Sequence, residues 1–286
     1  MKLRSLLIDS SDECTLNEIV HEITEISSVE YDPSLPTRFF EVILNGVQPI
    51  KNDILLNNEL IENYISEVCP VPFKNSFKHR TEISNWLEGD IFHEYKIYLN
   101  SSDQHITRPY GNDFHLSKDK TDNVKQVELI ELKTNQGDIL AKGFILHHSY
   151  LGAISDSKVS GLRVRSGNIQ VGDNDVFRTL FKQERFNSWC IGEFHILEEK
   201  IKANGRRDGF EHNKHFYNFL DYLKPVSLNL SKIIEDTSRA RNKEKQKDNV
   251  HKFVTKKDKA IKKITQLIKK HNIPESASQK IINIID

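Results

Sequence analysis

The feature that most constrains the fold is a pair of apolar runs joined by a short polar turn. Residues 124–132 and 139–147 flank Thr-Asn-Gln-Gly at 134–137, and this arrangement predicts a β-hairpin. Two further runs, residues 161–171 and 189–197, are also typical of strands, and the first contains a turn. We therefore predict an α+β fold: a mainly antiparallel sheet with flanking helices.

Other elements are predicted around these strands. Apolar positions at helical spacing predict helices over residues 15–26, 59–68, 82–88 and 175–181. Strand-like runs cover residues 1–8, 38–44, 91–99 and 105–110. The polar residues 111–121 predict a loop.

The chain beyond Pro225 has a different composition. From Ser231 to the end it holds 15 Lys and Arg against 7 Asp and Glu, whereas the whole chain has 41 of each. We predict separate helices here, around residues 230–234, 250–268 and 277–285, after a helix that carries Phe216, Leu220 and Leu223. Lysines that solvate an amphipathic helix are the common case, and the helical extension would pack on the sheet, on a partner or on a second copy. A nucleic-acid surface stays open, although arginine and aromatic residues are sparse.

The cysteines and histidines indicate in which cellular compartment the protein is expected and whether a metal site is predicted. Cys14, Cys69 and Cys190 are widely spaced, odd in number and outside any CxxC pattern. No apolar run approaches the ~20 residues of a membrane span, so we expect a cytoplasmic protein without a membrane partner. The adjacent pair His147 and His148 has no carboxylate or cysteine at ligand spacing, so no metal site is predicted.

A glycine-punctuated loop, Lys-Ala-Asn-Gly-Arg-Arg-Asp-Gly-Phe-Glu at residues 202–211, follows the strand at 189–197. Arg206 and Arg207 supply planar forks of donors before a helix start, which suits an anion. Two arginines beside acidic residues are also typical of a solvated ion-pair cluster of little energetic weight. The residues alone leave both interpretations open.

The run RFNSWCIGEFHILEEKIKANGRRDGFEHN resembles the middle-domain signature of ATPases related to the 90-kilodalton heat-shock chaperones, within the GHKL superfamily. In that group a strand with a Gly-Glu-hydrophobic-His pattern precedes an Asn-Ala-Arg-Arg-Asp-x-Phe loop. In the chaperones the matching loop reads Asn-Leu-Ser-Arg-Glu. Its Asn aligns with Asn204, its Arg with Arg207 and its Glu with Asp208. Gly205 replaces the group's alanine, which loosens the loop and leaves the arginine in place.

A second segment, YISEVCPVPFKNSF at residues 64–77, is similar to the one that opens the middle domain in the same group, with Cys69 in place of alanine. The resemblance implies the transducer fold shared with the second domain of a ribosomal small-subunit protein. It also implies that Arg207 reaches the γ-phosphate of ATP, bound with Mg²⁺ by a separate domain. Asn204 and Arg206 would position the loop, and Lys158 is a candidate for a second phosphate-facing cation.

The same resemblance divides the chain. Residues 1–60 are expected to hold the end of an ATPase domain and a linker, residues 61–224 the transducer domain, and residues 225–286 the basic helical extension. Residues 2–7 resemble the last ATPase-domain strand, which implies a fragment or a natural short form. The GHKL nucleotide motifs do not occur, so the chain alone is not expected to hydrolyse ATP.

The implied partners are a GHKL nucleotide-binding domain, in the same or a separate chain, and a client protein or second copy. The implied activity is that of an Hsp90-like, ATP-dependent chaperone or conformational ATPase. Two alternatives stay open. The chain would be a non-catalytic interaction module whose basic tail is the working surface, or a nucleic-acid-associated subunit of the kind that gyrase-like and MutL-like relatives use.

Overall fold

The computed structural model describes residues 40–46, 54–89, 92–117 and 120–270, with Pro33, Arg38 and Pro274. The chain divides into two compact units, Met1–Lys51 and Asn52–Asp286. In the first unit, residues 40–46 are exposed and form neither helix nor strand, so the strand predicted at 38–44 is not found there. The elements predicted at residues 1–8, 15–26 and 277–285, and Cys14, lie outside the described residues.

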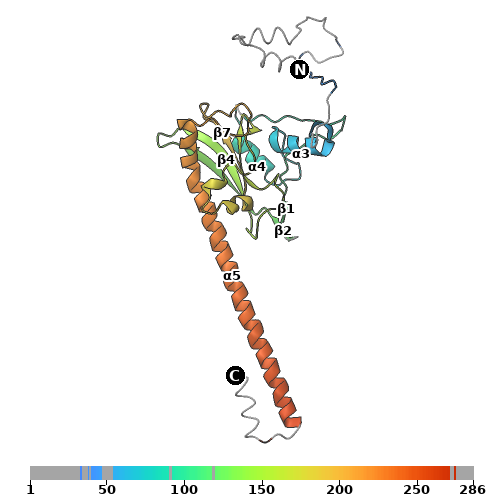
Figure 1. Ribbon diagram of the computed structural model, residues 1–286, viewed down its shortest axis with the longest axis vertical. Coiled ribbons are helices and arrows are strands. Elements are labelled where there is room, and N and C mark those ends of the chain that lie inside the picture. Colours follow the sequence, from blue (N-terminus) through green and yellow to red (C-terminus); the bar gives the residue numbers. More distant parts are fainter. Residues whose placement is uncertain are drawn as a thin grey trace, which may run out of the picture. The chain divides into compact units, whose positions relative to one another are not determined.

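A five-stranded sheet in the order β3-β4-β7-β5-β6 forms the centre of the second unit (Figure 1). Its strands are β3 (Gln126–Lys133), β4 (Ile139–His147), β5 (Gly161–Ser166), β6 (Ile169–Gln170) and β7 (Ile191–Ile196). Neighbouring strands are antiparallel except β5 and β7, which are parallel. The predicted α+β class, the hairpin and the two further strands are therefore confirmed.

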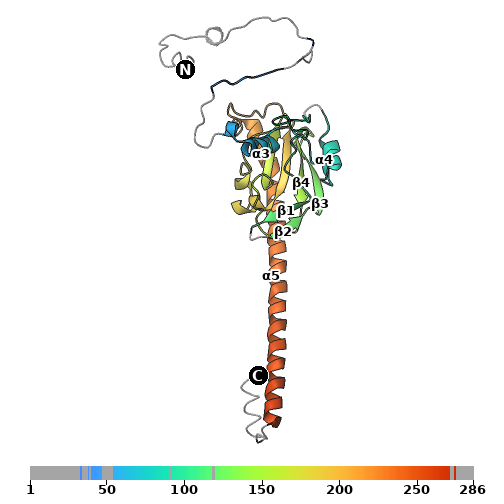
Figure 2. The same ribbon diagram turned by 90° about the vertical axis from the view of Figure 1, so that its right-hand side faces the viewer.

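Both faces of the sheet are covered. On one face Leu162, Val164 and Phe194 pack with apolar residues of the long helix α5 (Lys214–Lys270) (Figure 2). On the other face Phe144 and Leu146 pack with residues of the extended arm at 69–77, of helix α4 (Arg80–Leu87) and of the segment ending at Tyr110. Because both faces are covered, all six residues of β7 are buried, charged ones included.

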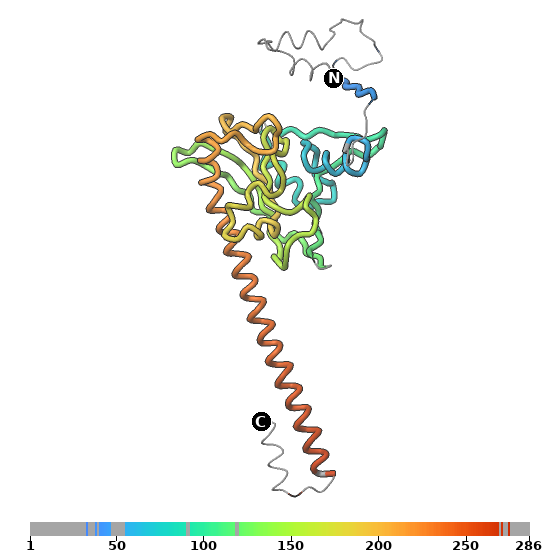
Figure 3. The backbone as a smooth tube through the Cα atoms, viewed as in Figure 1, coloured from blue at the N-terminus to red at the C-terminus, as the bar shows by residue number. Residues whose placement is uncertain are grey.

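The helix α5 is continuous over 57 residues and contains Pro225 (Figure 3). The prediction of separate helices after Pro225 is therefore wrong. An interior proline removes one helical hydrogen bond and costs about 3 kcal/mol. The helix tolerates it because an apolar stripe continues on both sides of it, with these residues buried: Phe219, Leu223, Leu230 and Ile234. No helix among the described residues is long and apolar enough to span a bilayer.

The helices predicted at 59–68 and 82–88 are confirmed as α3 (Asn58–Val68) and α4 (Arg80–Leu87), after a 3₁₀ turn, η1 (Ile54–Leu56). The Asn57 side chain caps α3 by accepting a hydrogen bond from Leu60 N at 3.1 Å. Beyond α3, two prolines in Cys-Pro-Val-Pro keep the chain extended. This arm lies against the sheet, since Val71 and Phe73 are buried.

Four local predictions fail. The described residues of 91–99, and those of 105–110, form no strand, because their backbones make isolated hydrogen bonds: Tyr95 N to Pro70 O, Ile106 N to Ile97 O and Arg108 N to Pro72 O. The predicted loop at 111–121 instead holds most of a hairpin, β1 (Asp113–Leu116) and β2 (Lys120–Asn123), because Phe114 and Leu116 are buried. The predicted helix at 175–181 is a single 3₁₀ turn, η2 (Arg178–Leu180), followed by η3 (Glu184–Trp189).

Candidate functional site

The loop at residues 203–210 closes like a small hairpin. A bridge joins Ala203 and Phe210, and Glu211 N donates to Lys202 O at 2.9 Å. Inside the bridge, Asn204 organises the turn. Its N–H donates to Gly209 O at 3.0 Å, and its carbonyl accepts from Arg207 N at 3.0 Å. The tip, residues 205–208, is exposed, so the loop presents both arginines to solvent.

Arg207 fastens this loop to the β5–β6 turn. Its backbone is left-handed, with φ of 57°, and its carbonyl accepts from Gly172 N at 2.8 Å. Its Nη2 donates to Ser166 O at 3.1 Å and, weakly, to Ile169 O at 3.5 Å. The Nε and Nη1 groups make no hydrogen bond to any described residue. The guanidinium is therefore anchored at one nitrogen, with donors left for an external anion.

The acidic residues beside the arginines do not pair with them. Asp208 accepts from the Asn204 side chain at 2.7 Å, and no described carboxylate forms an ion pair with Arg206 or Arg207. The structure thus lacks, among its described residues, the ion-pair cluster that was the alternative interpretation of this loop.

The structure brings Asn204, Arg206 and Arg207 together in one loop but places Lys158 elsewhere. Lys158 Nζ donates to Asn63 Oδ1 of α3 at 2.9 Å. It lines a polar cavity of about 480 Å³ between α3 and residues 99–109. No contact among the described residues joins Lys158 to the arginine loop, so the two cations do not form one described site.

Gly205 does not require glycine on backbone grounds. Its φ is outside the left-handed region, and a Cβ there would meet no atom within 4 Å. We expect Gly205→Ala to raise the free energy of unfolding by about 0.4–1 kcal/mol, because alanine restricts the unfolded chain. Gly167→Ala is the matched control. Its site is equally open but has φ of 59°, so urea denaturation should show a loss of about 1–2 kcal/mol. An equal loss in both variants would contradict this loop conformation.

The β5–β6 turn lies between the surface arginine and the interior. Gly167 and Asn168 have φ of 59° and 60°, as in a two-residue type I′ hairpin turn. The Asn168 side chain lies inside the protein, where Oδ1 accepts from Arg108 Nη2 at 2.6 Å and Nδ2 donates to His93 O at 2.6 Å. The same turn therefore contacts Arg207 on the outside and a buried polar cluster on the inside.

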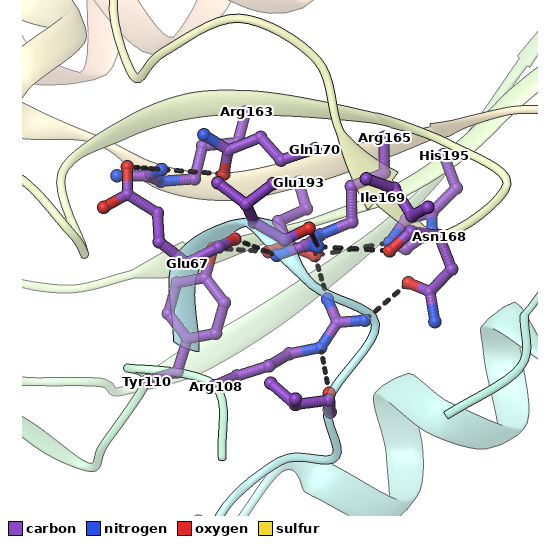
Figure 4. A network of polar contacts seen from close by, with 12 residues as sticks. Glu67, Arg108, Tyr110, Arg163, Arg165, Asn168, Ile169, Gln170, Glu193 and His195 are labelled. Atoms are coloured by element: carbon purple, nitrogen blue, oxygen red, sulfur yellow. Dashed lines mark hydrogen bonds and ion pairs between the residues drawn. The ribbon is translucent and has the colours of Figure 1, made fainter. Parts of the chain in front are cut away.

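Glu193 of β7 is the centre of that cluster, which we call the Glu193 cluster: Arg108, Tyr110, Arg165, Asn168, Glu193 and His195 (Figure 4). Arg165 donates two hydrogen bonds of 2.9 Å to the Glu193 carboxylate. Arg108 Nη1 also bonds it, and Tyr110 Oη donates to it at 2.8 Å. Burial alone would raise the pKa of Glu193, but the two guanidiniums outweigh burial and hold this pKa well below its usual range.

The cluster also holds α3 and the extended arm. Arg165 donates to three carbonyls at the C-terminal end of α3, those of Glu67, Val68 and Cys69, at 2.8–3.3 Å. Arg108 Nε donates to Val71 O at 3.0 Å. Next to them, Arg163 bonds the Glu67 side chain at 2.9 Å. The buried guanidiniums therefore join the sheet to α3 and to the extended arm.

His195, which belongs to this cluster, is almost fully buried. Its Nε2 lies 3.3 Å from a Glu193 oxygen, but neither ring nitrogen makes a well-directed hydrogen bond to a described residue. Burial lowers the pKa of His195 to about 4, although the negative charge of Glu193 acts in the opposite direction.

This pKa predicts acid sensitivity. Between pH 6.5 and about 4 the folded chain binds fewer protons at His195 than the unfolded chain, so stability falls as the pH falls. Over this pH range the free energy of unfolding lost through His195 amounts to about 3 kcal/mol. Urea denaturation across this range should show a clearly smaller loss for His195→Phe, whose ring keeps the edge contact with Phe92. Equal pH slopes in variant and wild type would refute the assignment.

Sequence reasoning identified the loop but missed the cluster. Alternation along β5 puts Arg163 and Arg165 on the opposite strand face from Leu162 and Val164, but alternation alone does not reveal that this face is buried too. One signal was present. Charged residues alternate with apolar ones in two neighbouring strands, Arg-Val-Arg at 163–165 and Glu-Phe-His at 193–195.

Comparison of the chain with protein-family models, curated proteins and solved structures finds no match.

Proposed function

We propose that the second unit is the transducer part of an Hsp90-like conformational ATPase of the GHKL superfamily. Arg207 contacts the γ-phosphate of ATP, which a separate nucleotide-binding domain holds with Mg²⁺. Asn204 shapes the loop, and Arg206 adds positive charge beside it. ATP supplies the anion, and this chain supplies the guanidinium that senses it.

The observation that carries the proposal is the state of Arg207. Its guanidinium is exposed, anchored by carbonyl oxygens alone, and paired with no described carboxylate. An arginine kept for structure is commonly neutralised by an acidic partner, and Asp208 is directly adjacent. Here Asp208 binds Asn204 instead, at 2.7 Å, which leaves the guanidinium charge available.

Contacts inside the protein support a route for the signal. A phosphate that draws Arg207 away removes its hydrogen bonds to Ser166 and Ile169 in the β5–β6 turn. The turn's inner side chain, Asn168, bonds Arg108, which holds the extended arm through Val71 O. A shift of the turn therefore changes the contacts by which the arm and α3 are held on the sheet. A client or partner surface at that place would change its conformation with them.

The test is ATP turnover by this chain joined to, or mixed with, a GHKL nucleotide-binding domain. Turnover that needs both parts, and that falls when Arg207 is replaced, supports the proposal. Turnover that is independent of the second unit would show that the assigned function is wrong.

A second candidate function is a non-catalytic interaction module. The observation that favours it is the part of α5 beyond the sheet, where every residue from 242 to 256 is exposed. In this case partner binding depends on the helix and persists when Arg207 is replaced.

A further inference from the structure

The part of α5 beyond the sheet, residues 239–270, carries an apolar stripe with a seven-residue period. Val254, Ile261 and Ile268 follow one another at intervals of seven, and Phe253 and Leu267 are separated by two such intervals. The stripe is uncovered at its start, since Phe253 is 70 % exposed. Apolar residues that recur every seven positions on an exposed helix face fit the seam of a helix that pairs with another helix.

The flanks of this stripe are strongly basic. Residues 250–268, which carry the stripe, contain six lysines and one acidic residue, Asp258. Charges beside a coiled-coil seam decide which partner pairs, because like charges repel and opposite charges attract across it. A second copy of the helix would bring the same positive charge to the seam, so a helix with acidic flanks fits better.

Two other partners fit less well. A helix that lies on a membrane needs a wide apolar face, often with several aromatic residues, whereas Lys257 occupies the seam and Phe253 is the single aromatic residue of this segment. Binding to single-stranded nucleic acid relies on aromatic stacking and arginine, and the segment has two arginines, Arg239 and Arg241. A polar residue within a seam is instead a known device that fixes register between paired helices.

We propose that residues 239–270 are one strand of a heterotypic coiled coil and that the partner is an amphipathic helix with acidic flanks. The lysines beside the seam select the acidic partner. The seam consists of these residues: Val250, Phe253, Val254, Ile261, Ile264, Leu267 and Ile268. The sheet domain fixes the start of the helix, because Leu230 and Ile234 are buried against it. The helix is therefore presented to the partner already folded, which lowers the ordering cost of pairing. This inference does not depend on the ATPase proposal.

The test uses the full chain and a labelled synthetic peptide of about four heptads, with leucine at the seam positions and glutamate beside them. Fluorescence anisotropy should show saturable one-to-one binding that weakens as salt is raised. The same peptide with lysine in place of glutamate should bind at least about tenfold more weakly, a difference of about 1.4 kcal/mol.

Two variants with the same charge change separate seam packing from charge attraction. Phe253→Asp places a carboxylate in the seam, and Thr255→Asp places one on the outer face, where Thr255 bonds its own helix at His251 O. We expect the first to weaken peptide binding by at least about tenfold and the second by less than about threefold. Circular dichroism and urea denaturation check that both chains stay folded.

Several results would overturn the proposal. Equal weakening by both variants would mean that attraction between charges alone holds the peptide. Sedimentation of the free chain as a dimer that Phe253→Asp dissociates would make the partner a second copy. Seam-dependent binding to anionic vesicles or single-stranded RNA, with no binding of the acidic peptide, would assign the helix to a membrane or to nucleic acid.

Discussion

Glu193→Gln is expected to lower the free energy of unfolding by about 4 kcal/mol, because it leaves two buried guanidiniums without their counter-ion. Arg108 and Arg165 are almost fully buried and make a combined three hydrogen bonds to this carboxylate. Burial lowers the pKa of Arg108, but the guanidinium stays charged at neutral pH, so it cannot escape the penalty by losing its proton. Urea denaturation at pH 7 measures the effect.

Glu128→Gln is the matched control, with the same substitution in a neighbouring part of the sheet. Glu128 pairs with His147 at 2.7 Å, but its side chain is 43 % exposed, so the loss should stay below about 1 kcal/mol. In the Glu193→Gln background, Arg108→Met should cost less than in the wild type, since its partner is already gone. If the two glutamine variants were equally stable, Glu193 would not be the centre of the cluster.

Under the proposed ATPase function, Arg207→Ala is expected to reduce ATP turnover by about 10²–10³-fold when a GHKL nucleotide-binding domain is joined to the chain, as loss of a transition-state donor does. The reduction should appear in kcat, while the affinity for ADP, which has no γ-phosphate, stays the same. Arg207→Lys should recover part of the rate, because lysine keeps the charge but not the planar fork.

Arg185→Ala controls for the loss of an exposed arginine. Arg185 bonds Gln183 within its own 3₁₀ region and has no contact with the arginine loop among the described residues. Its turnover should stay within about twofold of wild type, as is usual for a surface substitution. Unfolding free energies of all three variants must also be compared. If Arg207→Ala lost stability and activity together, Arg207 would be a structural clamp of the β5–β6 turn and not a sensor.

The sheet could be predicted from sequence because its signals are local. The hairpin of β3 and β4 combines two apolar runs with a turn sequence, and β5 to β6 turns at Gly167 and Asn168, where a left-handed backbone is needed. The hairpin of β1 and β2 has no such signal. Its residues are mostly polar, and Asp122 of β2 forms hydrogen bonds with His148 and Ser149. These two residues come after β4, the second strand of the following hairpin.

The Glu193 cluster and the single long helix depend on tertiary packing instead. Nothing near Arg165 in sequence reveals that the end of α3 will lie over it, 97 residues away at Val68. In the same way, Pro225 is a local reason to end a helix, and only the sheet beneath Leu223 and Leu230 outweighs it. The arginine loop was recognised as a loop, but the contact of Arg207 with Ser166 was not predictable from spacing.

The sequence separations within the Glu193 cluster also affect the order of events during synthesis. Arg108 precedes Glu193 by 85 residues, so at ordinary ribosomal speeds it waits roughly 4–17 s for its counter-ion to be made. During that interval β3 and β4 are already made, but Arg108 has no counter-ion, so the hydrogen bonds that Glu193 organises do not yet hold α3 and the extended arm on the sheet. The nascent chain therefore passes through a stage in which this half is exposed to aggregation or to chaperone binding until β7 emerges.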